Sequence, residues 1–302
     1  MAINLNRRSF LRQSSALFAA TQVDSLLRIA RAANPIPVGL GLFAVEDEWT
    51  KDPQATVRAL SKMGYQVLEF WAPYLEWTPA QAKDTRKLLD DLGVRCGATH
   101  NDGPTLTAEG LPKAIELNQI LGSKYIVVSG NRNPVLGLNA GAFTPNSGKV
   151  TGLEGYKRVG DQLTSFSKKV QAAGLQMGYH NHPAEFKAID GKRPMDVIAA
   201  NTPKELMLQL CVGACMESHG DPVEFIKANP GRIRHIHCKD WGPALGHDSI
   251  IGEGDAPWRQ VFAAAESVGG VEFYLIENLG SKSHRSLATA QRCMANWKKL
   301  RA

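Results

Sequence analysis

The sequence predicts an α/β fold, specifically a (β/α)8 or TIM barrel. From Pro37 onward, short apolar runs of strand length alternate with amphipathic helical patterns, and this alternation repeats eight times. Eight such units in about 265 residues match the count and length of a (β/α)8 barrel. A doubly wound open sheet is the alternative that the same alternation allows.

Each apolar run predicts a strand, and the periodic segment after it predicts a helix. Many helical segments end at a glycine, as at Gly64, Gly93, Gly122 and Gly174, which is typical of helix C-caps. Strands are expected at residues 38–43, 66–71, 94–100, 125–129, 176–181, 206–211, 233–238 and 272–277. Helices are expected at residues 54–63, 79–92, 108–121, 153–173, 195–201, 222–228, 258–268 and 286–300.

Two glycine-containing segments resemble nucleotide-binding motifs, but both lack the required context. Gly39 and Gly41 belong to a pattern like the dinucleotide fingerprint, yet they fall inside the first strand and not in a turn that opens a helix. Gly148 and Lys149 lack the spacing of a P-loop and the Ser or Thr that follows its lysine. No nucleotide cofactor is therefore expected.

The N-terminal segment has the pattern of a twin-arginine signal peptide. Arg7 and Arg8 precede a modestly apolar stretch, and the small residues around Ala32 and Ala33 suit a cleavage site. Charged residues interrupt the stretch, so an amphipathic N-terminal helix is the alternative. The expected organisation is a signal peptide over residues 1–33 and a barrel domain over residues 34–302. Export by the twin-arginine machinery would place the protein in the periplasm.

The basic charge of the chain belongs mostly to this leader. The formal net charge is +6, from 35 basic and 29 acidic residues, but the first 33 residues hold five arginines and one aspartate. The remaining chain is nearly neutral, which argues against nucleic acid as a partner. No run of about 18 apolar residues exists, so stable membrane insertion is not expected. Whether the protein forms a homo-oligomer is left open.

A long segment without helical or strand periodicity follows the fourth predicted strand. Residues 131–150 are rich in Gly, Asn and Pro. In a barrel this position lies at the catalytic face, where long loops act as lids or contact the substrate. A mobile insertion without function is the alternative.

Side chains that offer N, O or S donors gather where the predicted strands end. Residues 178–186 contain two histidines and a glutamate directly after a strand, and alternate strand residues point the same way. Because catalytic groups of TIM barrels lie at the carboxyl ends of strands, these side chains are expected to form one site. Hydrogen-bonded structural histidines are the alternative. The donors and their neighbours are Glu69, Trp71, His100, His180, His182, Glu185, Cys211, His235, His237, Lys239, Asp240 and Glu277.

Several segments, in order along nearly the whole mature chain, resemble the sugar phosphate isomerase/epimerase family with its xylose isomerase-like barrel. The resemblance extends to the exported, twin-arginine-tagged members of that family. It implies a barrel enzyme that holds one divalent metal ion with residues from strands five to eight. The matching segments lie at residues 179–186, 208–213, 220–226, 230–233, 237–240, 252–255 and 274–277.

Carried over to this chain, the resemblance assigns the metal to His180, Cys211, His237 and Glu277. His180 stands where the family usually has a glutamate, and Cys211 where it has an aspartate. A thiolate with two imidazoles suits Zn²⁺ better than Mn²⁺ or Mg²⁺, although Fe²⁺ and Co²⁺ also fit. Cys211 as an inert thiol beside a three-ligand site, and a decayed site, are the alternatives. Zn²⁺ or Mn²⁺ is expected.

The expected function is a metal-dependent isomerase or epimerase that removes a proton next to the carbonyl of a sugar or keto-sugar. Glu185 or His182 is the expected base, with Glu277 as a ligand that doubles as base. Trp71, His100 and Lys239 are expected to bind the substrate. An exported enzyme is expected to meet free sugars and glycosides, not sugar phosphates. A keto-glycoside lyase or hydrolase and a catalytically degenerate carbohydrate-binding protein are the alternatives; phosphodiester hydrolysis fits the charge poorly.

Overall fold

Eight parallel strands close into a barrel in chain order, in the part of the chain that the computed structural model describes. That part comprises residues 35–129, 152–278 and 285–302. The expected signal peptide at residues 1–33 and the expected lid segment at residues 131–150 both lie outside these ranges. The strands are β1 Val38–Gly41, β2 Val67–Trp71, β3 Arg95–Asn101, β4 Tyr125–Ser129, β5 Gln176–His180, β6 Met207–Cys211, β7 His235–Cys238 and β8 Phe273–Ile276.

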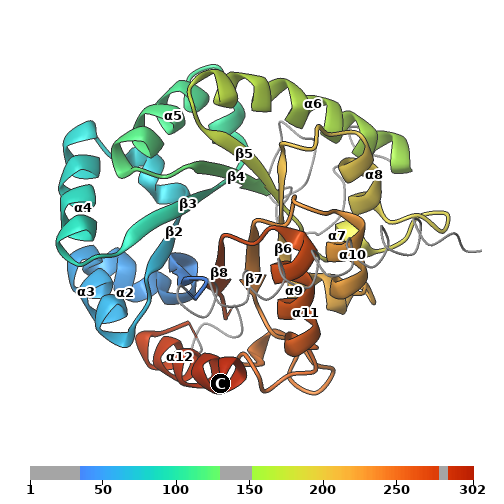
Figure 1. Cartoon of the computed structure of the whole chain (residues 1–302). Coiled ribbons are helices and arrows are strands. Elements are labelled where there is room, and N and C mark those ends of the chain that lie inside the picture. Colours follow the sequence, from blue (N-terminus) through green and yellow to red (C-terminus); the bar gives the residue numbers. More distant parts are fainter. Residues whose placement is uncertain (1–34, 130–151, 279–284) are drawn as a thin grey trace, which may run out of the picture. The chain divides into compact units, whose positions relative to one another are not determined.

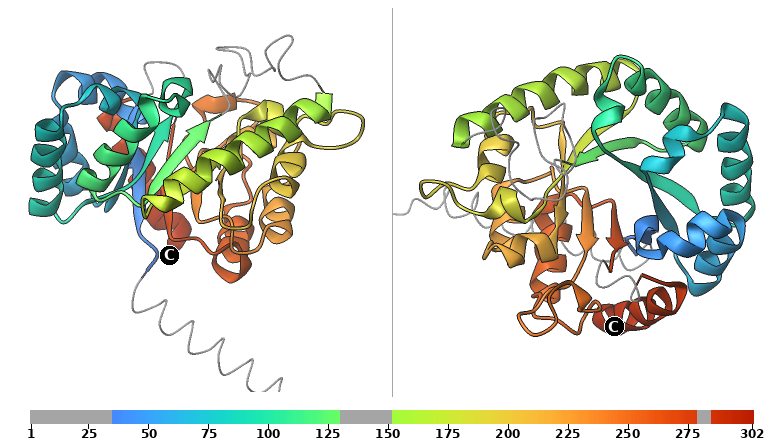
Figure 2. Two further views of the ribbon diagram at one scale, coloured as in Figure 1. Left: turned by 90° about the horizontal axis from the view of Figure 1, so that it is seen from above. Right: turned by 180° about the vertical axis from the view of Figure 1, so that it is seen from behind.

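The helices form an outer ring around these strands (Figure 1), and the same ring appears from behind in Figure 2. No helix in the described ranges has the length and apolar character that a membrane crossing needs. The α-helices are α2 Glu46–Lys51, α3 Pro53–Met63, α4 Pro79–Asp91, α5 Gly110–Leu121, α6 Gly152–Ala172, α7 Pro183–Phe186, α8 Pro194–Ala200, α9 Val212–Glu217, α10 Pro222–Ala228, α11 Trp258–Ala264 and α12 Leu287–Arg301. Single 3-10 turns occupy Leu42–Val45, Ala72–Glu76, Gly103–Leu106 and Gly246–Asp248.

The predicted barrel is confirmed, and the predicted elements agree with it to within a few residues. The fourth strand has the predicted bounds, 125–129, as does helix α10. The first strand is shorter than predicted, because Leu42–Val45 turns into a 3-10 helix. The predicted helix 258–268 is split into α11 and a π-helical turn at Ala265–Gly269. The short helices α2, α7 and α9 were not predicted, since each is too brief to show a period.

Helix ends follow the sequence signals. Thr78 caps α4 by accepting the Gln81 N–H at 3.3 Å, and the Gln81 side chain accepts the Thr78 N–H at 2.8 Å. Gly64 and Gly122 end α3 and α5 with positive φ angles of 102° and 71°. A side chain in that left-handed conformation is strained, so glycine stops each helix at this point.

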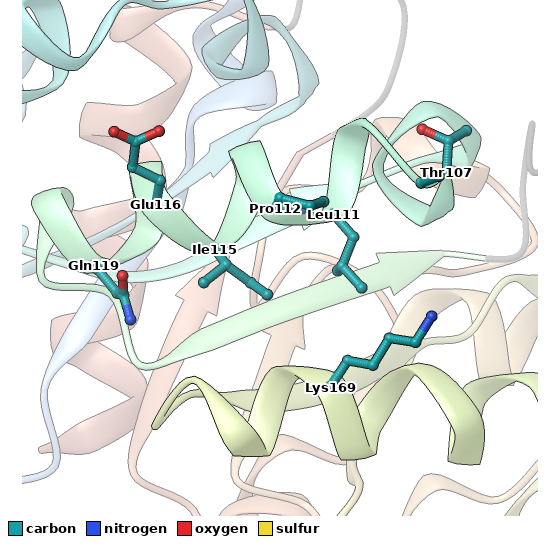
Figure 3. Close-up of a pocket in the computed structure, with 8 residues that line it drawn as sticks. Thr107, Leu111, Pro112, Ile115, Glu116, Gln119 and Lys169 are labelled. Atoms are coloured by element: carbon teal, nitrogen blue, oxygen red, sulfur yellow. The ribbon is translucent and has the colours of Figure 1, made fainter.

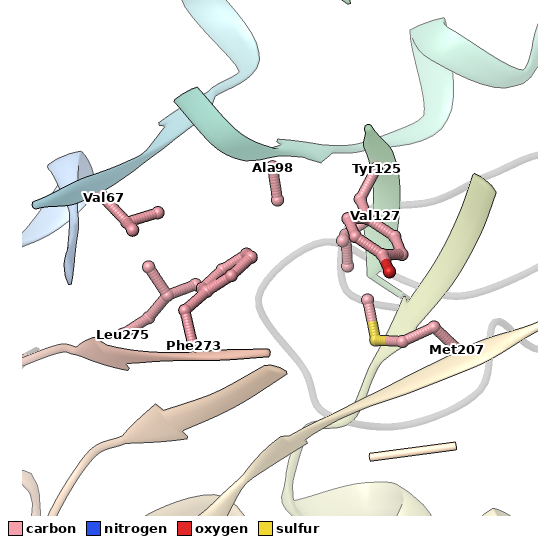
Figure 4. Close-up of a cluster of buried hydrophobic side chains, with 7 residues drawn as sticks. All are labelled: Val67, Ala98, Tyr125, Val127, Met207, Phe273 and Leu275. Carbon is pink, nitrogen blue, oxygen red and sulfur yellow. The ribbon is translucent and has the colours of Figure 1, made fainter. Parts of the chain in front are cut away.

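Apolar side chains fill the barrel toward the amino ends of the strands (Figure 4). His235 lies in this layer with no exposed surface, stacked on Phe273 at 3.9 Å and edge-on to Tyr125 at 4.3 Å. Burial lowers its pKa well below the usual value, so the imidazole is neutral. This apolar cluster fills the amino end of the barrel, so the other histidines of the strands lie toward the carboxyl end. Its members are Val67, Ala98, Tyr125, Val127, Met207, Phe273 and Leu275.

Gly39, one of the two glycines that resembled a dinucleotide fingerprint, has a packing role. A side chain on Gly39 would collide with the carbonyl of Val67 in the neighbouring strand β2. Both Gly39 and Gly41 belong to β1, and only the single 3-10 turn Leu42–Val45 follows them. Close approach of two strands therefore explains the glycine at position 39 without a nucleotide.

Candidate active site

A pocket of about 420 Å³ lies at the carboxyl ends of the strands. Most of the sequence-predicted site residues line it, and they come from strands spread around the whole barrel. His237 is fully buried and contacts the lining residues Glu69 and Glu277. Glu185 is the predicted residue that neither lines the pocket nor contacts these carboxylates. The predicted residues in the lining are Trp71, His100, His180, His182, Cys211, Lys239 and Glu277.

Three histidines converge in this pocket. Ring nitrogens of His100, His180 and His237 lie within 4.8 Å of one another. The ring of His180 packs edge-on to His100 at 4.7 Å and to His237 at 4.6 Å, measured between centroids. His180 and His237 are predicted ligands, whereas His100 was assigned to substrate binding. The structure therefore groups His100 with the candidate metal ligands.

His237 sits between two carboxylates. Its Nε2 lies 2.7 Å from Glu69 Oε2, and its Nδ1 lies 3.2 Å from Glu277 Oε2. Burial alone would lower the pKa of His237, but Glu69 and Glu277 outweigh it and raise the pKa well above its usual value. In return, His237 holds the pKa of both carboxyl groups low, although burial opposes this. Negative charge is thus concentrated around one imidazole.

His180 is held by a chain of polar side chains that reaches across the barrel. Its Nδ1 lies 2.7 Å from Gln209 Oε1, and Gln209 Nε2 donates to Glu69 Oε1 at 2.7 Å. His180 and Gln209 are register partners on β5 and β6, which places the two side chains next to each other. Burial, with the neighbouring histidines, lowers the pKa of His180 well below its usual value, so its imidazole is neutral. A neutral imidazole is the form that binds a metal ion.

These donors fit a divalent metal ion. His237 Nδ1 is buried and has no hydrogen bond, although a carboxylate oxygen of Glu277 lies beside it. Adjacent imidazole and carboxylate donors are the set that Zn²⁺, Mn²⁺ and Fe²⁺ bind. His180, His237 and Glu277 would hold such an ion, with His100 within reach.

Cys211 lines the pocket but lies outside this donor group. Among the described residues, the group of three donor residues whose ligand atoms all lie within 4.8 Å of one another is His100, His180 and His237, and Cys211 does not belong to it. Burial raises the pKa of Cys211, which favours the neutral thiol. Its backbone N–H donates to Asn181 Oδ1 at 2.8 Å, and this bond fixes the end of β6. Cys211 as a ligand therefore stays a prediction, beside its alternative as a buried thiol.

Glu185 is engaged in the cap of the short helix α7. One oxygen accepts the Tyr179 hydroxyl at 2.9 Å, and the other accepts the backbone N–H of His182 at 2.8 Å. Burial raises the pKa of Glu185 to about 7. Its carboxylate therefore positions His182 from behind. The pattern His182-Pro-Ala-Glu185, with proline at the first helical position, has the spacing of a capping box, and this signal was overlooked in the sequence.

His182 faces the pocket with a neutral ring. It lies 5.2 Å from His180 between centroids. Burial, together with His100 and Lys239, lowers the pKa of His182 to about 3. A neutral imidazole can donate a hydrogen bond to a carbonyl oxygen without carrying charge.

Aromatic and cationic side chains also line the pocket. Phe43 packs edge-on to Trp71 at 5.2 Å, and the Arg285 guanidinium lies 5.0 Å from the Phe43 ring centroid. Phe43 and Arg285 both line the pocket and were not predicted. Phe43 ends the first predicted strand but offers no N, O or S donor, and Arg285 does not lie at the end of a predicted strand. Aromatic walls are typical of sites that bind sugar rings, whose C–H faces pack on them.

Lys239 extends from the end of β7 and is 7% exposed. Within the described residues, its ammonium group has no hydrogen-bond or ion-pair partner. The next residue, Asp240, accepts N–H groups from Trp241, Gly252 and the Trp258 indole at 2.7–2.8 Å. This buried carboxylate ties down the loop that follows β7, and so fixes the direction in which Lys239 points.

A second cavity, of about 410 Å³, lies on the outside of the barrel between α5 and α6 (Figure 3). Leu111, Ile115 and Lys169 are among its lining residues. It contains none of the clustered histidines, and so the pocket at the barrel mouth is the candidate active site.

A closed (β/α)8 barrel with its polar donors at the carboxyl ends of the strands defines the TIM-barrel class. Residues 57–295 match the model of the xylose isomerase-like TIM barrel family, and the chain belongs to that family.

Similar proteins agree with this assignment. The chain is 25% identical to the rhizopine catabolism protein MocC of Rhizobium meliloti over 284 residues, which cover 87% of this chain and 81% of that protein. A sugar phosphate isomerase/epimerase from Parabacteroides distasonis superposes with a TM-score of 0.68 at 23% identity, covering 87% and 94% of the two chains. An L-ribulose 3-epimerase superposes with a TM-score of 0.61 at 16% identity, covering 87% and 95%. At these identities the two structures support the fold alone.

Proposed function

We propose that this protein is a divalent-metal-dependent isomerase or epimerase that removes a proton next to the carbonyl group of a sugar or keto-sugar. The observation that supports this most is the convergence of His100, His180 and His237, with Glu277 beside His237, at the mouth of the barrel. The similarity to sugar isomerases and epimerases is consistent with it. When bound there, a divalent ion supplies Lewis-acid stabilisation of negative charge on substrate oxygens.

Glu277 is the base in this proposal. His237, and more weakly Lys239, keep its pKa below the usual value although burial opposes them, so the carboxylate is ionised. Its Oε2 faces His237, which leaves Oε1 to accept the proton from the carbon next to the carbonyl. Glu185, which sequence analysis named as a candidate base, has both oxygens engaged and is assigned to positioning His182.

His182 is the electrophile in this proposal. Its neutral ring donates a hydrogen bond to the substrate carbonyl oxygen, where charge grows as the enediolate forms. Trp71 and Phe43 cover one face of the sugar, and Lys239 binds an oxygen of the substrate. Because these groups line a pocket of about 420 Å³, the substrate is a monosaccharide or a single residue of a glycoside.

Solvent hydrogen exchange tests this proposal. The purified protein is loaded with Zn²⁺ or Mn²⁺ and incubated in D2O with a panel of free aldoses, ketoses and keto-sugars, and NMR follows deuterium at the carbon next to the carbonyl. We expect deuterium in at least one sugar, and none with Glu277→Gln. His219→Asn, on an exposed left-handed residue, is the control with full activity.

Product analysis then separates isomerisation from elimination of a leaving group, the lyase alternative. A protein that binds no metal and binds sugars equally well after His237→Ala would be a carbohydrate-binding protein, and that result contradicts the proposal. Exchange with sugar phosphates alone would contradict the choice of free sugars.

We also propose that the enzyme works in the periplasm after twin-arginine export. Arg7 and Arg8 carry this assignment. Replacement of both by lysine should retain the protein in the cytoplasm at its full length, as detected by cell fractionation and mass spectrometry. Equal periplasmic amounts of the variant and the parent would refute it.

A further inference from the structure

Glu69 has no part in the mechanism above, although it is the most buried carboxylate of the pocket, with 2% exposure. Ionised carboxylates are rarely buried without partners, because the loss of hydration strongly disfavours the charged form. Glu69 receives partners on both oxygens: Gln209 Nε2 at 2.7 Å on Oε1, and His237 Nε2 at 2.7 Å on Oε2. One oxygen thus leads to His237, and the other leads through Gln209 to His180.

The contact with Gln209 determines which nitrogen of His180 carries a proton. The amide NH2 group of Gln209 can only donate, so it faces the carboxylate; the reverse orientation would set two oxygens against each other. Gln209 Oε1 therefore faces His180 Nδ1 at 2.7 Å, and it can only accept. His180 is protonated on Nδ1, and its lone pair is on Nε2.

The contact of Glu69 with His237 likewise determines which ring nitrogen of His237 carries a proton, and here that nitrogen is Nε2. His237 Nε2 donates to Glu69 Oε2, which leaves Nδ1 as the nitrogen beside Glu277 Oε2 at 3.2 Å. That Nδ1 is buried without a hydrogen bond. His100 Nδ1, at 3.5 Å from the same carboxylate oxygen of Glu69, is the third histidine near this residue.

We propose that Glu69 is a positioning residue that selects Nε2 of His180 and Nδ1 of His237 as the ligating nitrogens of the metal site. It does so from β2, through one hydrogen bond to His237 and a relay through Gln209 to His180. This role rests on the proposed metal-dependent function. Hydrogen-bond partners of metal-binding histidines fix the tautomer and ring orientation, and their loss typically weakens metal binding by about 10- to 100-fold.

An exchange of the two side chains tests the relay. In Glu69→Gln, the new NH2 group either meets a second donor, the His237 N–H or the Gln209 NH2, or forces the Gln209 amide to turn over. A turned Gln209 donates to His180 Nδ1, which moves the His180 proton to Nε2 and removes the lone pair there. In Gln209→Glu, two carboxylates face each other. In the double variant E69Q/Q209E every contact is restored: Gln at 69 accepts from His237 and donates to Glu at 209, which accepts from His180. Affinity for Zn²⁺ and Co²⁺ is measured by competition with a chromophoric chelator, and the Co²⁺ absorption spectrum reports the ligand geometry.

We expect each single variant to bind Zn²⁺ about 10- to 100-fold more weakly, and the double variant to recover most of the loss. Glu266→Gln is the matched control, because this carboxylate accepts the Tyr274 hydroxyl at 2.9 Å outside the barrel. It should leave Zn²⁺ affinity unchanged. A double variant no better than the singles would overturn the relay.

Nitrogen-15 NMR of the histidine rings in the metal-free parent tests the assignment without any variant. We expect His180 to be protonated on Nδ1, and a proton on Nε2 alone would overturn the proposal. The two proposals fail differently. A parent protein that binds none of the ions overturns the metal-dependent function itself. Normal binding by the parent together with unchanged affinity in Glu69→Gln overturns only the role of Glu69.

Discussion

The backbone N–H of His182 donates to the Glu185 carboxylate at 2.8 Å, and this contact joins the two residues that the sequence indicates as candidate bases. The Tyr179 hydroxyl occupies the other oxygen. The carboxylate is buried, and its pKa of about 7 follows mainly from that burial. Because the pKa of Glu185 is raised in the folded protein, the stability of the protein should depend on pH.

Glu185→Gln should change the pH profile of unfolding. An unfolded glutamate has a pKa near 4.3, so between about pH 4.5 and pH 7 the native protein binds more protons at Glu185 than the unfolded chain. The contribution of Glu185 to the free energy of unfolding therefore falls as pH rises through this window. A glutamine does not titrate, so its contribution does not change with pH. Between pH 5 and pH 8, the free energy of unfolding of the variant should rise relative to that of the parent by on the order of 2 kcal/mol. Urea unfolding at four pH values measures this.

The exposed Glu109→Gln provides the comparison for that experiment, since it lies on the surface. Parallel pH profiles for Glu185→Gln and the parent would show that Glu185 is ionised in the native protein at pH 5, contrary to this expectation.

His237→Ala should destabilise the metal-free protein by about 3–5 kcal/mol, because it leaves Glu69 and Glu277 buried without their common partner. Addition of Glu69→Gln should recover part of that loss, since one of the two unpaired charges is removed. Thermal or urea unfolding of the parent, the two single variants and the double variant gives the coupling energy. Strictly additive effects would mean that the charges do not interact.

Cys211→Ala should leave Zn²⁺ and Mn²⁺ affinity unchanged within experimental error, because Cys211 stands outside the group of converging nitrogens. Cys211→Asp extends the test by offering a carboxylate at the same place. Elemental analysis and competition titration give the metal preference of each variant. A loss of Zn²⁺ affinity of about tenfold or more in Cys211→Ala would identify the thiolate as a ligand.

Lys239→Met should weaken substrate binding while it preserves or raises thermal stability. The ammonium group has no hydrogen-bond or ion-pair partner within the described residues, so its removal relieves a buried charge at the cost of only a weak attraction to Glu277 there. A hydrogen bond from a charged group to the substrate contributes about 1.5–3 kcal/mol, which corresponds to about a 10- to 100-fold rise in KM. Steady-state kinetics and the melting temperature are measured beside Lys227→Met, an exposed lysine on α10. An unchanged KM would exclude a substrate contact.

Much of the fold could be predicted because the signals are local. Short apolar runs, glycines at helix ends and alternation of elements are properties of neighbouring residues, and the strand at 125–129 was predicted with its observed bounds. Side-chain parity is also local, so His235 and His237 were correctly expected on one face of β7. Helices α7 and α9 were missed because they span only four and six residues.

The composition of the site was harder to predict, because it depends on which strand ends meet. His100 and Cys211 both lie at strand ends, and nothing local shows that His100 joins His180 and His237 while Cys211 stands outside the group. Glu69 illustrates the same point. It was seen at the end of a strand, but its role depends on contacts with residues 140 and 168 positions away in the chain.

The sequence by itself determined that this protein is a (β/α)8 barrel of the xylose isomerase-like type with histidines and carboxylates at the carboxyl ends of its strands. Those properties follow from periodicity, turn residues and motifs. Only the tertiary structure decided which of these side chains touch. Closure of the barrel brings β2 across from β6 and β7, and the register of these strands sets the Glu69 carboxylate beside Gln209 and His237. Contacts between strands far apart in the chain depend on that closure and register, and no local pattern records them.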